Sequence, residues 1–141
     1  MAVSSSANAT WEGDLAGGRG TVRAASGAFP ELALTWRQRA ETRESGTSPE
    51  ELIAAAHASC FAMALSFGLG NAGTPPQRLE TSAEVTFQAG QGITGIHLTV
   101  RGTVPGLDAD GFRQAAESAK SGCPVSQALK AVPITLDASL A

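Results

Sequence analysis

The stretch GTSPEELIAAAHASCFAMAL, residues 46–65, decides the fold of this 141-residue chain. Ser48 is a typical N-cap residue, Pro49 suits the first helical position, and Glu51 completes a capping box. From this start to about Leu69, apolar residues lie on nearly every side of the predicted helix. Such a helix must be covered all round. One modest sheet covers only one side of it, so we expect a central helix with a second subunit over its remaining face.

Length and composition indicate one soluble domain that covers residues 1–141. The chain is 43% hydrophobic, which is enough for a single packed core. A formal net charge of −3 gives no electrostatic reason to expect nucleic acid as a partner. Residues 1–10 contain no basic start followed by an apolar run, and 2 cysteines are too few for a secreted disulfide framework. We therefore expect a cytoplasmic protein.

Residues 52–77 contain no Asp, Glu, Lys or Arg, which raises the question of a membrane span. Polar and flexible residues interrupt this stretch, namely His57, Ser59, Ser66, Gly68, Gly70 and Asn71. The many Ala and Gly residues also keep its hydropathy weak. A buried helix of a soluble protein is therefore the expected structure, and no membrane partner is expected.

Strand-like alternation occurs on both sides of the central helix. Before it, residues 20–25 and 32–38 have the spacing of short strands, and the polar residues 39–47 indicate a loop. After it, apolar and polar residues alternate over residues 81–88 and 96–101. These two stretches predict a pair of strands joined by a glycine-containing loop.

The C-terminal third adds a helix and a closing strand. Asp108 is expected to cap a helix that places Phe112 and several alanines on one face, and residues 132–140 alternate again. The order is strands, long helix, strands, helix, strand. We see no βαβ series with parallel crossovers, so the fold class is α+β with a mostly antiparallel sheet.

The two cysteines have different local settings. Cys60 lies about 16 Å along the helix from its N-terminus, beyond the reach of the dipole. Local sequence alone therefore favours an inert buried thiol at this position, unless a cation is brought to it. Cys123 stands before Pro124 at the start of a short helix, where orphan N–H groups favour a thiolate, although an ordinary turn residue is the alternative.

Both histidines also admit two interpretations. His57 precedes Cys60 by three residues, so the two side chains can share a helix face and permit a Cys–His nucleophile pair. A histidine that faces a polar pocket is the simpler alternative. His97 is most simply a surface residue on the polar face of its strand. Only His57 and Cys60 have a close metal-like spacing, so no metal site is expected.

Three arginines, Arg37, Arg39 and Arg43, lie just before the central helix among several glutamates. Such a charge run is usually a solvated loop. An arginine nevertheless stays charged when buried, and its fork of donors can hold a thiolate and a peroxide oxygen together. A carboxylate such as Glu50 would be needed to hold that arginine in place.

Residues 46–65 resemble the central helix of the OsmC/Ohr family, and GCPVSQAL at residues 122–129 resembles its second cysteine motif. The resemblance extends over nearly the whole chain and includes WEG at 11–13 and GTV at 20–22. The histidine before the first cysteine is more similar to OsmC than to Ohr. The family implies an OsmC-like α+β fold, in which mostly antiparallel sheets wrap around long central helices in an intertwined homodimer.

The resemblance also implies a set of catalytic residues. It makes Cys60 the peroxidatic cysteine and Cys123 the resolving one, whereas the local sequence favours Cys123 as the more acidic thiol. Arg39 best matches the catalytic arginine. Arg37 remains an alternative, because the spacing to residue 46 is one residue longer and an aromatic residue of the family pattern is absent. Glu50 matches the carboxylate partner of that arginine.

The implied function is a thiol-dependent peroxidase for oxidative stress defence, with no metal or bound organic cofactor. The Cys60 thiolate attacks an organic hydroperoxide, becomes a sulfenic acid and condenses with Cys123 to a disulfide. An external dithiol, of lipoyl type or similar, then reopens that disulfide. An apolar pocket formed by Phe61, Met63 and interface residues would favour alkyl hydroperoxides over hydrogen peroxide.

Two other functions are compatible with the same residues. A Cys60–His57 acyl transferase or hydrolase would need no second thiol. A non-catalytic dimeric domain that binds a hydrophobic ligand would leave both cysteines reduced in the presence of peroxide.

Overall fold

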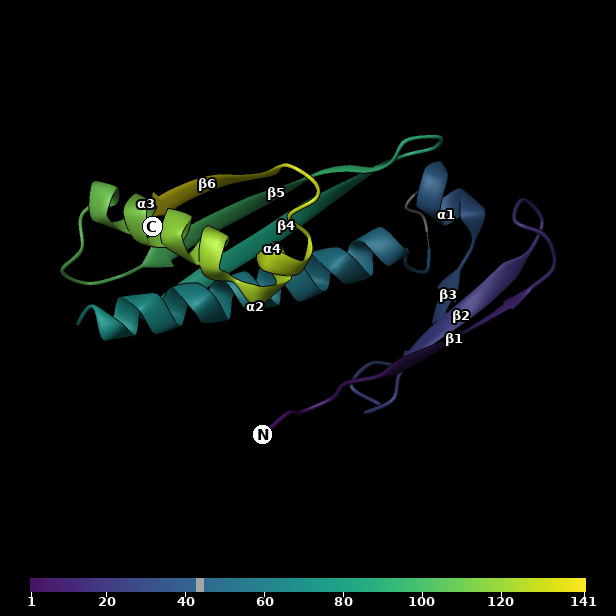
Figure 1. The fold of residues 1–141 in the computed structure, drawn as a ribbon, viewed down its shortest axis with the longest axis horizontal. Helices are drawn as coiled ribbons and strands as arrows, with labels where there is room; N and C mark the ends of the chain where they lie inside the picture. Colours follow the sequence, from purple (N-terminus) through teal and green to yellow (C-terminus); the bar gives the residue numbers. More distant parts are fainter. Residues whose placement is uncertain (43–44) are drawn as a thin grey trace. The chain divides into compact units, whose positions relative to one another are not determined.

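A computed structural model describes residues 1–42 and 45–141 of the chain. The chain divides into two compact units, Met1–Glu50 (unit 1) and Glu51–Ala141 (unit 2). Unit 1 carries the purple to blue colours of Figure 1, and unit 2 carries the teal to yellow colours. The expectation of a single domain over residues 1–141 stays a prediction.

Unit 1 contains a three-stranded antiparallel sheet in the order β1-β2-β3. Its strands are β1 (Ala7–Glu12), β2 (Arg19–Ala24) and β3 (Leu32–Leu34). The alternation over residues 20–25 predicted β2, whereas β1 was not predicted. All six residues of β1 are exposed, so β1 lacks the alternation that marks a half-buried strand.

A short helix, α1 (Trp36–Ala40), corrects two expectations for unit 1. The predicted strand over residues 32–38 ends at Leu34, and Arg39 belongs to this helix rather than to a loop. The cause is local: the Thr35 hydroxyl accepts a hydrogen bond from the Gln38 N–H at 3.1 Å and so caps the helix.

The long helix α2 (Pro49–Asn71) begins at the predicted proline, and the rest of unit 2 forms a sheet with two further helices. These elements are β4 (Arg78–Gln88), β5 (Gly92–Thr103), α3 (Ala109–Gly122), α4 (Pro124–Ala128) and β6 (Ile134–Leu140). Asp108 caps α3 as predicted, since its carboxylate accepts the Gly111 N–H at 2.7 Å.

Strands β4, β5 and β6 form the sheet of unit 2 in that order. The β4–β5 pair is antiparallel, as expected, but β5 and β6 pair in parallel. The chain between these two strands passes through α3 and α4, which makes one parallel crossover that the sequence analysis missed. Two helices of unequal length fill this connection, so it does not resemble a regular βαβ unit. The α+β class and the mostly antiparallel pairing are confirmed.

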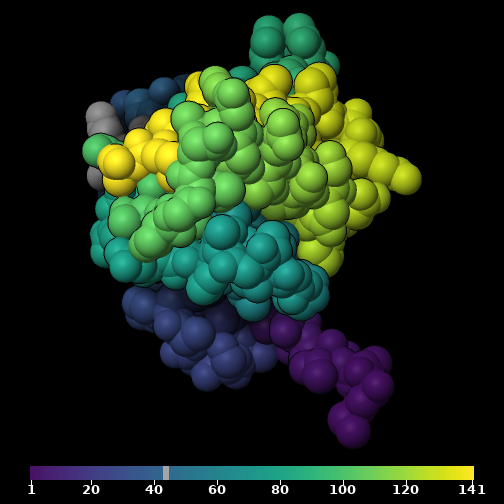
Figure 2. Space-filling model, turned by 90° about the vertical axis from the view of Figure 1, so that its left-hand side faces the viewer, coloured from purple at the N-terminus to yellow at the C-terminus, as the bar shows by residue number. Residues whose placement is uncertain are grey.

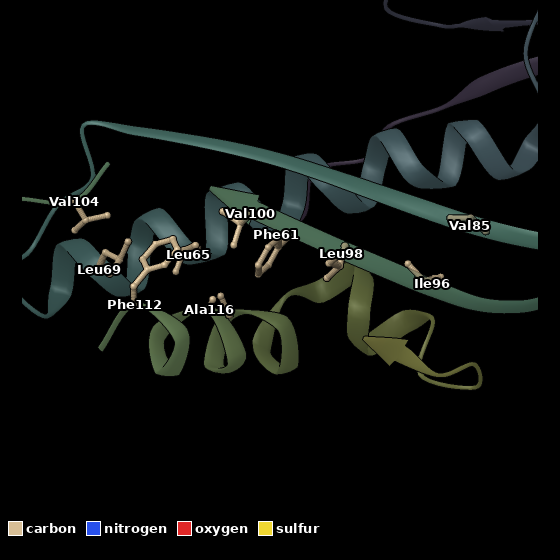
Figure 3. Close-up of a cluster of buried hydrophobic side chains, with 11 residues drawn as sticks. Phe61, Leu65, Leu69, Val85, Ile96, Leu98, Val100, Val104, Phe112 and Ala116 are labelled. Atoms are coloured by element: carbon tan, nitrogen blue, oxygen red, sulfur yellow. The ribbon is translucent and has the colours of Figure 1, made fainter. Parts of the chain in front are cut away.

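The core of unit 2 lies between the sheet and its helices (Figure 3). Phe61 and Leu65 of α2 meet Phe112 of α3, and Leu98 and Val100 of β5 close the cluster. These five side chains are fully buried. In the space-filling view of Figure 2, the green atoms of α3 and the yellow atoms of β6 lie against each other.

Only glycine fits at position 102 of β5. A Cβ atom there would lie 2.5 Å from the Phe112 ring, far inside van der Waals contact. The phenyl ring of α3 can therefore pack directly on the strand backbone, which anchors the helix before it reaches Cys123.

Helix α2 has one buried face and one exposed apolar face. It is long and apolar enough to span a membrane by length and composition, yet Phe61, Leu65 and Leu69 pack into the core of unit 2. On this face α2 is a core helix of unit 2. On the other face, Met63 and Phe67 are each 73% exposed. This face agrees with the expectation of a helix that is apolar all round.

Candidate active site

Both cysteines belong to unit 2, where different elements position them. Cys60 lies in the middle of α2 and is half-buried, whereas Cys123 joins α3 to α4 and is fully buried. Pro124 occupies the first turn of α4, as predicted, because its missing N–H and fixed φ suit a helix start. Both cysteines are free thiols.

The two thiols are neighbours, close enough for Cys123 to raise the pKa of Cys60, although they lie 63 positions apart in the sequence (123 − 60). Cys60 also interacts with the backbone N–H of Val125 in the first turn of α4. We refer to Cys60, Cys123 and this N–H group as the thiol centre. Burial raises the pKa of the Cys60 thiol, the hydrogen bond with Cys123 raises it further, and the Val125 N–H opposes both.

The orphan N–H groups in the first turn of α4 do not bind the side chain of Cys123, the cysteine that the local sequence favoured. Cys123 is the N-cap residue of α4, but its side chain makes no capping hydrogen bond. One of these N–H groups, that of Val125, instead interacts with Cys60. The local argument for Cys123 as the activated thiol therefore fails, because helix packing brings a different sulfur to the N-terminus of α4.

A second polar contact joins α2 to α4. The Nε2 atom of His57 lies 2.7 Å from the Ser126 hydroxyl, and both side chains are buried. Burial lowers the pKa of His57 from its ordinary value, so the imidazole is neutral at neutral pH. The sequence was compatible with a Cys–His pair or with a histidine in a polar pocket, and the observed partner is Ser126. Ser126 itself was missed, although it stands within the second cysteine motif.

Unit 1 holds a charged pair that matches two predicted residues. Arg39 binds the carboxylate oxygen Oε1 of Glu50 through Nε at 2.9 Å and through Nη2 at 2.9 Å. The Glu50 side chain is only 1% exposed, and that of Arg39 is 35% exposed. We refer to these two residues as the arginine pair. A guanidinium held at two nitrogens has a fixed orientation, which suits it to positioning an anion.

The alternative arginine lies in a different setting. Arg37 Nε is 3.7 Å from the Glu41 carboxylate, and both side chains are more than 60% exposed. Such a pair on a helix surface contributes little and is easily exchanged for water. Arg43 and Glu44, which belong to the same charge run, lie outside the described residues.

Two further predictions concern residues away from the thiols. His97 lies on β5 and contacts the Thr135 hydroxyl at 2.6 Å and the Asp137 carboxylate at 3.0 Å. It is therefore part of a polar surface of the sheet. Among residues 1–42 and 45–141, no group of three or more His, Cys, Asp or Glu side chains is arranged to hold a metal ion.

An apolar cavity of about 270 Å³ lies within unit 1 next to the arginine pair. Its walls come from β1, β3, α1 and the adjoining loops, and the lining residues are Trp11, Leu15, Leu34, Thr35, Trp36, Arg39 and Pro49. The expected contribution of Phe61 to a substrate pocket is wrong, because that side chain is fully buried in the core of unit 2. Sequence periodicity could not reveal this cavity, since its lining residues come from separate elements.

Comparison with known proteins gives a consistent family assignment. Residues 42–137 match the family model described as OsmC-like protein. The chain is 48% identical to Peroxiredoxin OsmC of Escherichia coli (strain K12) over 99% of both chains. It is also 32% identical to the organic hydroperoxide resistance protein of Xanthomonas axonopodis pv. citri (strain 306), over 64% of this chain and 66% of that protein.

A solved structure gives the same result for the fold. The structure described as an organic hydroperoxide resistance protein OsmC from Legionella pneumophila superimposes with a TM-score of 0.69. That match has 25% sequence identity and covers 95% of this chain and 96% of the other.

Proposed function

We propose that Cys60 and Cys123 carry the reaction of this chain. The chain belongs to the OsmC-like protein family and is a peroxidase that reduces organic hydroperoxides in oxidative stress defence. The proximity of the two thiols, which interact with each other, is the observation that carries this proposal. A disulfide needs its two Cβ atoms within about 4 Å of each other, and neighbouring thiols need little movement to reach that distance.

The burial of the two thiols supports the order in which they react. Cys60 is half-buried and can meet a peroxide that arrives from solvent, whereas Cys123 is fully buried. A fully buried thiol beside Cys60 is well placed to attack a sulfenic acid formed there. We therefore assign Cys60 as the peroxidatic cysteine and Cys123 as the resolving cysteine.

The chemistry requires two steps in the protein and one with a reductant. The Cys60 thiolate attacks the distal oxygen of ROOH, the O–O bond breaks, and protonation of the leaving alkoxide gives ROH and Cys60–SOH. Cys123–SH then attacks this sulfur, and water leaves as the disulfide forms. An external dithiol, for which a lipoyl group is the proposed example, reduces the disulfide by exchange.

The thiol centre needs a positive charge to react at neutral pH. Burial and the contact with Cys123 raise the pKa of Cys60, and the Val125 N–H offsets this only in part. A guanidinium near the sulfur would favour the thiolate. We assign this role to Arg39, because the buried Glu50 carboxylate holds its guanidinium in one orientation, whereas Arg37 lies on the surface.

We further propose that the arginine comes from a second subunit. Glu50 and Cys60 belong to the same helix and lie ten residues apart (60 − 50), or roughly 15 Å along its axis. A guanidinium bound to Glu50 is therefore not expected to serve the cysteine of its own helix. The exposed apolar face of α2, with Met63 and Phe67, would pack against the same face of another copy. These two arguments support a homodimer with shared active sites.

Mixed dimers test this arrangement directly. Subunits with Cys60→Ser are unfolded together with Arg39→Ala subunits, refolded, and assayed for consumption of cumene hydroperoxide. If the arginine acts across the interface, each mixed dimer regains one intact site, and a statistical mixture reaches about a quarter of wild-type activity. If each subunit uses its own arginine, the mixture is as inactive as the two separate variants.

The cavity of unit 1 supports a preference for alkyl hydroperoxides. It is lined mostly by apolar side chains and includes Arg39, so a hydrocarbon group can lie beside the proposed catalytic guanidinium. Each buried CH₂ group contributes about 0.8 kcal/mol to binding. Cumene hydroperoxide is therefore expected to react faster than hydrogen peroxide, and equal or reversed rates would contradict this role of the cavity.

Turnover assays test the proposed cycle and its setting. With dihydrolipoamide as the reductant, wild-type protein should consume cumene hydroperoxide through many cycles, and Cys60→Ser should consume none. Cys123→Ser should lose sustained turnover, because the sulfenic acid then lacks its internal partner. Undiminished turnover by Cys123→Ser would contradict the disulfide cycle. A cytoplasmic location, where thiols are kept reduced, agrees with this dependence on dithiols.

A further inference from the structure

The buried contact between His57 and Ser126 has no part in the two-cysteine chemistry described above. His57 is fully buried and Ser126 is 4% exposed. Their Nε2 and Oγ atoms are 2.7 Å apart. Buried polar side chains of this kind are hydrogen-bonded because an unpaired one destabilises the fold. The position of this pair in the fold indicates a more specific role than satisfying two polar groups.

Each member of the pair lies three residues from a cysteine in the sequence. His57 precedes Cys60 by three residues on α2, and Ser126 follows Cys123 by three residues in α4. Within α2, residues at this spacing are neighbours on one helix face, and Ser126 lies in the first turn after the N-cap residue Cys123. The hydrogen bond therefore connects α2 to α4 within one turn of both reacting sulfurs.

The state of the imidazole defines the direction of this hydrogen bond. Burial lowers the pKa of His57, and its Nδ1 atom is buried without a hydrogen-bond partner. In a neutral imidazole, one nitrogen is a donor and the other an acceptor. A buried N–H without a partner is less tolerable than a bare acceptor, so Nε2 carries the proton and donates it to the Ser126 hydroxyl.

Helix α4 depends on contacts of this kind for its position. It has only five residues, which is too short for stability on its own. Its other polar links to α2 run from Cys123 and from the Val125 N–H to the sulfur of Cys60. Both links change when that sulfur gains an oxygen atom. The His57–Ser126 bond contains no reacting atom and so persists through the oxidation of Cys60.

We propose that His57 and Ser126 are positioning residues for disulfide formation, holding the start of α4 against α2 so that Cys123 stays beside Cys60 after Cys60 is oxidised. The step that they assist is Cys60–SOH + HS–Cys123 → Cys60–S–S–Cys123 + H₂O. This inference rests on the proposed two-cysteine cycle and adds two residues to it. It assigns them no contact with the peroxide.

The test separates the two steps of a single turnover in the full-length protein. Wild type and Ser126→Ala are mixed with one equivalent of cumene hydroperoxide and quenched at successive times, and mass spectrometry counts thiol, sulfenic acid and disulfide. We expect the peroxide step of Ser126→Ala to stay within about twofold of wild type and disulfide closure to slow about tenfold, as expected for a lost positioning contact. With excess peroxide, more Cys60 should become sulfinic acid.

The equilibrium of the disulfide gives a second readout. A tenfold loss in the tendency of the two thiols to close corresponds to a rise of about 30 mV in the reduction potential. Redox titration against a dithiol buffer measures this shift. A residue that only stabilises the fold would change the urea midpoint without selectively changing this potential.

Variants at His57 provide a matched pair of substitutions. In His57→Gln the amide nitrogen lies near the position of Nε2, so the disulfide should close at about the wild-type rate. In His57→Asn it lies near the position of Nδ1, so closure should be slow. The double variant His57→Asn, Ser126→Ala should close no more slowly than either single variant, because the two residues act through one contact. If Ser126→Ala proved too unstable to assay, the Gln and Asn variants carry the same test.

Thr81→Val is the control for a general loss of packing near α2. The Thr81 hydroxyl donates to the Ala58 carbonyl of α2 at 3.0 Å, and this bond does not involve α4. Thr81→Val should therefore close its disulfide at the wild-type rate. Wild-type closure in Ser126→Ala, or equal slowing in Thr81→Val, would overturn the positioning role. If wild-type protein itself formed no disulfide with peroxide, the two-cysteine cycle would fail instead.

Discussion

The thiol centre of unit 2 and the arginine pair of unit 1 are opposite kinds of site. The thiol centre brings together both sulfurs, but burial and the neighbouring Cys123 raise the pKa of the attacking thiol, and the Val125 N–H opposes this only in part. The arginine pair has full charges and a carboxylate that is 1% exposed, but it contains no nucleophile. The thiol centre contains no positive charge, and the arginine pair contains no nucleophile. The proposed reaction therefore needs groups from both sites.

The largest effect is expected from removing the charge of the arginine pair. Arg39→Ala takes away the cation that we propose to favour the Cys60 thiolate and to stabilise the departing oxygen. The second-order rate of the peroxide step should fall about 10²- to 10³-fold, as for the loss of a positioned donor in other active sites. Stopped-flow measurement with cumene hydroperoxide tests this expectation, and the pH at which the rate rises should also shift upward.

Arg37→Ala is the matched control, because it removes an arginine of the same short helix that lies on the surface. It should change the peroxide rate by no more than about twofold, consistent with the small contribution of exposed ion pairs. A large loss in Arg37→Ala together with a small loss in Arg39→Ala would reverse the assignment of the catalytic arginine.

The next largest effect is expected from a substitution on the exposed apolar face of α2, which would join two subunits. Phe67→Glu places a charge on this apolar face, where Phe67 is 73% exposed in the single chain. The variant should be monomeric in sedimentation experiments and lose about tenfold or more in activity, because a buried unpaired charge opposes association. Ser118→Glu adds the same charge to the exposed side of α3 and should leave the dimer intact. A wild-type monomer with full activity would contradict the shared site.

A moderate effect is expected from the cavity beside the arginine pair. Leu15→Ala shortens an exposed side chain that lines this cavity. The ratio of kcat/KM for cumene hydroperoxide to that for hydrogen peroxide should fall roughly two- to fivefold, because about 1 kcal/mol of apolar contact is lost. Val3→Ala, at an exposed position that does not line the cavity, should leave the ratio unchanged.

The smallest effect concerns the pH dependence of stability. Burial lowers the pKa of His57 from 6.5, so the unfolded chain takes up a proton more readily than the folded chain. The free energy of unfolding should therefore fall as the pH falls below about 6.5. Above that pH, the contribution of His57 should not change with pH. His57→Gln should reduce the loss of unfolding free energy between pH 7.5 and 5, because glutamine does not titrate in this range. Equal losses in both proteins, measured by urea unfolding, would contradict this.

Much of unit 2 could be predicted from the sequence, because its signals are local. The start of α2 at Pro49, the Asp108 cap of α3 and the start of α4 at Pro124 follow from residues within one turn. The contact between Cys60 and Cys123 was implied by family resemblance and could not come from spacing. The pairing of Arg39 with Glu50 was likewise implied by the family resemblance.

The remaining features depend on tertiary contacts that the sequence pattern does not contain. The parallel pairing of β5 with β6 is decided by how α3 packs on the sheet, where Gly102 makes room for Phe112. The sequence around Ser126 does not predict its role, because its partner His57 is 69 residues away in the sequence. The local argument for an activated Cys123 failed because packing gives the Val125 N–H to Cys60.

The central claim is that Cys60 and Cys123 form one redox pair. The most direct test is the intact mass and free-thiol count of the reduced protein before and after one equivalent of cumene hydroperoxide, repeated with Cys60→Ser and Cys123→Ser. The account predicts the loss of two hydrogens and of both thiols in wild type, no reaction in Cys60→Ser, and a trapped oxidised Cys60 in Cys123→Ser. Two free thiols remaining in wild type after oxidant would contradict it.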